Sequence, residues 1–118
     1  MIQLHRVKAA TVIACSWFPM LVAQQQPTWS SDVATIVHRS CAPCHRPKQP
    51  APFSLLSYDD VFKKRKFVAE VTASGYMPPW QPTHGDFVGD RRLSTKDLAT
   101  IKSWVEAGAP RGDEGKEP

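Results

Sequence analysis

Cysteine, methionine and long apolar runs are all scarce in this 118-residue chain. It has three cysteines and three methionines, and its formal net charge is only +4. So few cysteines exclude a scaffold held by several disulfides. A charge this small gives no support for nucleic-acid binding. The longest apolar run covers about 15 residues and falls short of the roughly 20 that a membrane-spanning helix needs.

That apolar run, residues 9–23, follows a short basic segment and ends on Ala23. A basic start, an apolar middle and a small final residue are typical of a secretory signal. We therefore predict that residues 1–23 are a signal peptide and that the protein is exported to the periplasm. A second route is lipid anchoring through Cys15, because the three residues before it resemble the box that precedes a lipidated cysteine.

Residues Cys41-Ala42-Pro43-Cys44-His45 have the form C-x-x-C-H, which is the attachment signal of a c-type haem. Two thiols at this spacing can add to the two vinyl groups of one porphyrin, and the next residue offers an imidazole to its iron. The same pair of cysteines could instead form half of a zinc site or a redox-active dithiol. A helical pattern before the motif and a proline-rich loop after it favour haem c.

Met77 is the only methionine after residue 23, and it precedes Pro78 and Pro79. A thioether there is a suitable second axial ligand for iron in an electron carrier. His84, in a polar loop, is the rival ligand, whereas His38 is expected at the surface or partly packed. Trp80 is interpreted as a large core aromatic whose indole N–H could also reach a haem carboxylate.

Three helical segments are predicted around these motifs, and together they indicate an all-α domain at residues 24–110. The first begins at Ser30 or Ser31 and leads into the motif. The other two begin with S-x-x-D capping boxes at Ser57 and Ser94 and end near Gly75 and Gly108. Residues 111–118 are polar, and we expect this tail to fray.

Prolines 43, 47, 50 and 52 keep the segment after the motif out of a continuous helix. The same loop carries Phe53, Leu55 and Leu56, which are too apolar for a free linker and are expected to pack on the porphyrin. Pro52, Phe53 and Trp80 are the predicted pocket residues. Further along, the run Lys63, Lys64, Arg65 and Lys66 is either a solvated helix face or a docking patch for an acidic redox partner.

The order of these parts resembles a small single-haem class I cytochrome c. The match covers nearly all of the chain after the signal peptide. Within it, three segments look like the haem c modules of bacterial envelope proteins: Met77-Pro78-Pro79-Trp80, Arg91-Arg92-Leu93-Ser94 and Trp104-Val105-Glu106-Ala107-Gly108-Ala109-Pro110.

The resemblance implies a cytochrome c-like fold of three to four short helices around one covalent haem, with the first and last helices packed together. It implies thioether bonds from Cys41 and Cys44, His45 as proximal iron ligand and Met77 as distal ligand. It also implies that a proline carbonyl after the motif orients His45. Pro47, Pro50 and Pro52 all compete for that role.

The function expected from these features is outer-sphere transfer of single electrons between redox partner proteins, without an enzymatic activity of its own. The alternative is a haem c domain with an open distal site, acting as an enzyme module or gas sensor. A zinc or dithiol binding module is the third hypothesis.

Overall fold

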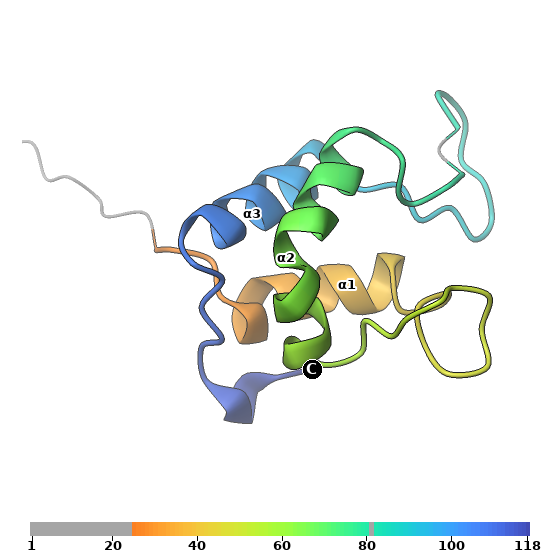
Figure 1. Cartoon of the computed structure of the whole chain (residues 1–118). Coiled ribbons are helices and arrows are strands. Elements are labelled where there is room, and N and C mark those ends of the chain that lie inside the picture. The colour runs from red at the N-terminus through yellow and green to blue at the C-terminus, as the bar shows by residue number, and fades with distance from the viewer. Residues whose placement is uncertain (1–24, 81) are drawn as a thin grey trace, which may run out of the picture.

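The computed structural model describes residues 25–80 and 82–118, and the secondary structure within these ranges is entirely helical (Figure 1). The predicted all-α class is therefore confirmed for this part of the chain. None of its helices is long and apolar enough to cross a membrane. The predicted signal peptide and Cys15 lie outside the described residues. The elements in chain order are η1 (Trp29–Val33), α1 (Ala34–Ser40), α2 (Tyr58–Ala73), α3 (Thr95–Glu106) and η2 (Glu114–Lys116).

The first helical path runs through η1 into α1 and ends directly before Cys41. Its cap is Thr28, whose side-chain oxygen accepts a hydrogen bond from the Ser31 backbone N–H at 3.2 Å. The prediction of Ser30 or Ser31 as the cap is wrong. Ser30 is buried, and its hydroxyl donates instead to the Arg111 carbonyl at 2.8 Å.

Both predicted capping boxes are present, at Ser57 with Asp60 for α2 and at Ser94 with Asp97 for α3. Asp97 also accepts a 2.8 Å hydrogen bond from Arg39 near the end of α1. Burial raises the pKa of the Asp97 carboxyl, but hydrogen bonds from Ser94 and the Arg39 charge act against it, and the net pKa is lowered. The start of α3 is thereby linked to the helix that precedes the C-x-x-C-H motif.

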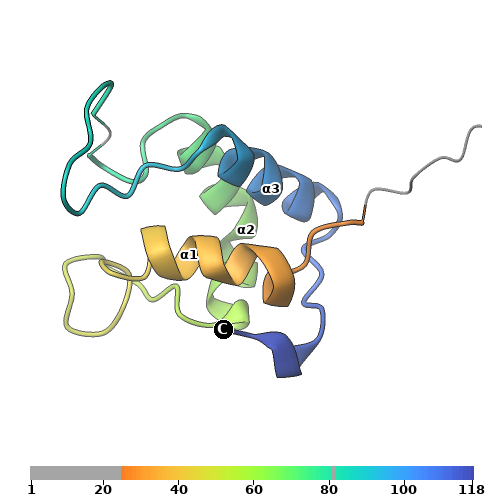
Figure 2. The same cartoon turned by 180° about the vertical axis from the view of Figure 1, so that it is seen from behind.

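The core lies where η1 and α3 meet, with α2 packed against α3 (Figures 1 and 2). Trp29 and Trp104 pack with ring centroids 6.3 Å apart, and at most 1% of either residue is exposed. The Trp104 indole N–H donates to the Pro110 carbonyl at 2.9 Å. The other large, fully buried side chains are Val33, Val37, Val61 and Ile101.

The C-terminal tail is attached to the start of the first helix, and so the expectation that it frays is wrong. Trp29 N donates to Pro110 O and Ser30 N donates to Arg111 O, each at 2.9 Å. Arg111 also pairs with Glu114 and Glu117, which keeps the tail folded back. Gly112 makes this approach feasible, since a Cβ atom there would lie 2.7 Å from the Thr28 hydroxyl oxygen.

Candidate functional site

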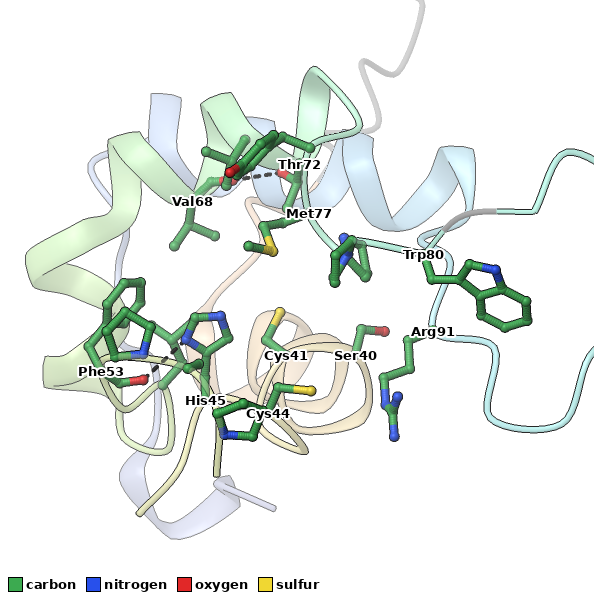
Figure 3. A pocket seen from close by; sticks show the side chains of 18 of the residues that line it. Ser40, Cys41, Cys44, His45, Phe53, Val68, Thr72, Met77, Trp80 and Arg91 are labelled. Carbon is green, nitrogen blue, oxygen red and sulfur yellow. Dashed lines mark hydrogen bonds between the residues drawn. The ribbon is translucent and has the colours of Figure 1, made fainter. Parts of the chain in front are cut away.

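The residues predicted as a site from the sequence lie around one cavity of about 460 Å³ (Figure 3). This volume falls within the range of roughly 300–1,000 Å³ typical of small-molecule sites. The cavity is bounded by the end of α1, one face of α2 and two loops. All seven predicted site residues line it, namely Cys41, Cys44, His45, Pro52, Phe53, Met77 and Trp80.

A tight turn brings the three motif side chains to the same wall. The backbone N–H groups of Cys44 and His45 both donate to the Cys41 carbonyl, at 3.2 and 3.0 Å. In Figure 3 both sulfur atoms and the imidazole border the same space. The end of α1 thus supplies a rigid base for the whole motif.

The Cys41 thiol is poorly suited to dithiol redox chemistry. Burial raises its pKa to about 11, despite the opposing effect of the Arg39 charge. A redox cysteine acts as a thiolate and normally has a lowered pKa. At neutral pH Cys41 is a protonated thiol in apolar surroundings, and this argues against the dithiol alternative.

His45 is oriented by the carbonyl of Phe53. Its Nδ1 lies 3.1 Å from that oxygen, and the two rings pack with centroids 4.6 Å apart. Because a carbonyl only accepts, the proton of the neutral ring is on Nδ1, and in that form the lone pair is on Nε2. The expectation that a proline carbonyl plays this part is wrong. The backbone N–H of Leu55 donates to His45 O at 2.9 Å, and this bond folds the loop back toward His45. The carbonyl that then reaches the imidazole belongs to Phe53, one residue past Pro52.

The proline-rich loop is anchored at both sides. Ala51 N donates to Cys44 O at 3.3 Å, and Asp60 at the start of α2 accepts from Ser54 Oγ at 2.9 Å. Phe53 and Leu55 line the cavity as expected. Leu56 does not line it and is 43% exposed, because its carbonyl lies 2.9 Å from His38 Nε2 on the side of α1. The expected packing of Leu56 into the pocket is therefore wrong.

Met77 stands on the opposite wall from the motif. Its backbone N–H donates to Val71 O at 3.0 Å, which fastens the turn to the end of α2. In Figure 3 its sulfur points into the space between α2 and the turn that carries Cys41 and His45. The arrangement places an imidazole and a thioether on facing walls of one cavity.

Trp80 is not a core residue. It is 52% exposed and lies at the cavity rim, with its ring turned outward in Figure 3 and in edge contact with Phe87 at 5.2 Å between centroids. The two prolines before it carry the chain away from the helices. His84 is exposed and, like the partly packed His38, is absent from the cavity lining.

The zinc alternative lacks a ligand set in the described part of the chain. Across residues 25–80 and 82–118, no three His, Cys, Asp or Glu side chains come together as a metal-binding group.

Several lining residues were missed from the sequence. Val68, Val71 and Thr72 were expected on the inward face of the middle helix but not assigned to the pocket, and with Phe67, which was not expected there, they form the α2 wall at i, i+1, i+4, i+5 spacing. Among the described residues, Arg91 is the only Asp, Glu, Lys or Arg side chain in the lining. It belongs to the Arg91-Arg92-Leu93-Ser94 segment of the resemblance, but the sequence analysis gave it no place in the pocket. The remaining missed residues are Ser40, Pro50, Ala51, Tyr76, Pro78, Pro79 and Gly89.

The basic run on α2 is divided between packing and solvent. The Lys64 ammonium lies 4.4 Å from the centroid of the Phe53 ring, and the Arg65 guanidinium lies 4.0 Å from that of Phe62. Lys63 and Lys66 are exposed. Half of the run therefore covers aromatic rings, and docking of an acidic partner stays a prediction.

Comparison of the chain with protein-family models, curated proteins and solved structures gives no match.

Proposed function

We propose that this protein is a c-type cytochrome that carries single electrons through one covalently bound haem. The observation that carries the proposal is the convergence of Cys41, Cys44 and His45 on one wall of an apolar cavity and Met77 on the facing wall. Cys41 and Cys44 would hold the haem covalently, and His45 and Met77 would be the iron ligands.

The cavity suits a group of this kind. Its lining is predominantly apolar, and its charged side chain, Arg91, belongs to an exposed residue. A porphyrin is a flat, largely apolar group with two carboxylates, so its site needs both an apolar slot for the ring and a solvent-exposed edge for the carboxylates. Bound there, haem c supplies reversible one-electron chemistry at its iron.

The chain's own part is to hold ligands still and keep water out. The Phe53 carbonyl keeps the proton of His45 on Nδ1, which leaves Nε2 aimed for coordination. The Met77 turn is fastened to α2 by its backbone. If His45 and Met77 both held the iron, substrate would have no site at the metal, and no acid, base or nucleophile would be required.

Replacing both Cys41 and Cys44 by alanine should abolish covalent attachment of the haem. The proteins are to be made in a host with the haem-attachment machinery and studied by intact mass and the pyridine haemochrome spectrum. Wild-type protein should carry the mass of one haem that acid–acetone does not extract. The double variant should carry none. A colourless wild-type protein from such a host would contradict the proposed function.

Redox partners with acidic surfaces are part of the same proposal, because Lys66 is exposed beside Phe67, a residue of the cavity lining. Lys66→Glu should slow electron exchange with an anionic probe such as ferricyanide several-fold at low salt, since like charge opposes encounter. Lys102→Glu is the matched control, because no residue of α3 lines the cavity. Stopped-flow rates that fall equally in both variants would contradict docking on this face.

A further inference from the structure

Arg92 is the centre of a hydrogen-bond network in the loop that follows the Met77 turn. Its Nη1 donates to the Pro82 carbonyl at 2.7 Å and its Nη2 to the Gly85 carbonyl at 2.8 Å. Its Nε pairs with the Asp90 carboxylate, and its backbone N–H donates to the same carboxylate at 2.8 Å. One side chain thus joins three points of the segment from Pro82 to Asp90.

The same segment closes against the turn that carries Met77. Phe87 packs edge-on against Trp80, three residues after Met77, at a centroid distance of 5.2 Å. Gly85 permits this contact, since a Cβ atom there would lie 3.1 Å from the Phe87 ring and its φ is +86°. Gly89, on the far arm of the loop, lines the cavity itself.

The network is partly shielded from water, which makes it stronger than a surface ion pair. The Asp90 side chain is 14% exposed and the Arg92 side chain 31%. A guanidinium offers a planar set of donors, so it can hold two carbonyls and a carboxylate at once. Lysine has the same charge but concentrates its donors at one point.

We propose that Arg92 is a positioning residue that holds the Pro82–Asp90 segment against the Met77 turn, and thereby keeps small competing ligands from displacing Met77 at the iron. The inference rests on the proposed function. The proposal also gives a role to the Arg91-Arg92 segment, whose presence is not explained by the haem attachment and iron ligation proposed above. Arg91 lines the cavity, whereas its neighbour Arg92 fixes the cavity wall.

The test is the affinity of ferric holoprotein for imidazole, measured well below the thermal midpoint. Without Arg92 the segment loses three attachments, so the Met77 turn opens more often and an external ligand binds more readily. We expect Arg92→Gln to bind imidazole at least tenfold more tightly than wild type. Arg92→Lys should lie close to Arg92→Gln, because one ammonium cannot span both carbonyls.

Lys96→Gln, with the same change in charge on the exposed first turn of α3, should bind imidazole as wild type does. A variant with a lowered thermal midpoint but wild-type imidazole affinity would overturn the proposal. If Arg92→Gln fails to fold, Asp90→Asn removes one partner of the network and should shift the affinity in the same direction. Unchanged affinity there would equally overturn it.

A second readout does not depend on haem. Phe87 is 48% exposed, and loosening its loop should speed chymotrypsin cleavage after it. We expect Arg92→Gln to be cut several-fold faster there than wild type or Lys96→Gln. Wild-type protein without a thioether–iron band would contradict the proposed function, and the cleavage rates would still decide the role of Arg92.

Discussion

We expect the replacement of Met77 by leucine to lower the reduction potential of the protein carrying the proposed haem by on the order of 0.2 V, a quarter of the roughly 0.8 V over which axial ligands set haem potentials. Leucine has nearly the volume of methionine and preserves packing. It has no sulfur to donate to iron. Met77 supplies the thioether of the facing wall. Spectroelectrochemical titration of both proteins measures the shift.

The ferric spectrum provides the accompanying signature. Wild-type protein should show the far-red charge-transfer band of a thioether bound to ferric iron, and Met77→Leu should lose it. Phe67→Leu is the control, since Phe67 also lines the cavity but offers no ligand atom. A five-coordinate, high-spin wild-type spectrum without the band would contradict Met77 as ligand and favour the alternative of an open distal site.

Trp104→Ala destabilises the domain by about 4 kcal/mol, within the range known for large aromatic residues removed from cores. Trp104 is 0% exposed, packs against Trp29 and donates to the Pro110 carbonyl. The lost free energy of unfolding therefore includes the cost of the cavity that the smaller side chain leaves and of a Pro110 carbonyl lone pair without its donor. The total free energy of unfolding of a small domain is about 5–15 kcal/mol, so the variant loses a large share of its stability. Guanidinium unfolding of the holoprotein, followed by far-ultraviolet circular dichroism, gives the difference.

The control for this measurement is Val88→Ala, because Val88 is fully exposed on the loop. Its free energy of unfolding should stay within about 0.5 kcal/mol of wild type. A Trp104→Ala variant that unfolds at the same denaturant concentration as Val88→Ala would show that the packing of η1 against α3 does not hold the domain together.

Features encoded locally were predictable from the sequence. The boxes at Ser57 and Ser94 satisfy their helix ends with side chains three residues away, so short-range spacing suffices to identify them. The C-x-x-C-H spacing similarly places both thiols and the imidazole within one turn. Met77 was a strong candidate because it is the only methionine after residue 23.

Features that depend on contacts distant in sequence were not predictable. Ser30 has the right side chain for a cap, but it donates to Arg111, which lies 81 residues further along the chain. The orienting carbonyl of His45 belongs to Phe53 and not to a proline, because the loop geometry depends on its attachment to α2 through Asp60. Trp80 was expected in the core from its size alone, but the size of a side chain does not determine whether it points into the core or toward solvent.

The anchoring of the tail on the first helix determines how this domain can be joined to something else. Pro110 and Arg111 pair with Trp29 and Ser30, and no residue from 25–39 or 92–118 lines the cavity. Both described ends therefore lie outside the stretches of chain that form the cavity. A tether or fusion joined at either end would not start at the cavity wall, so under the proposed function an electron could still pass between the cavity and a second protein.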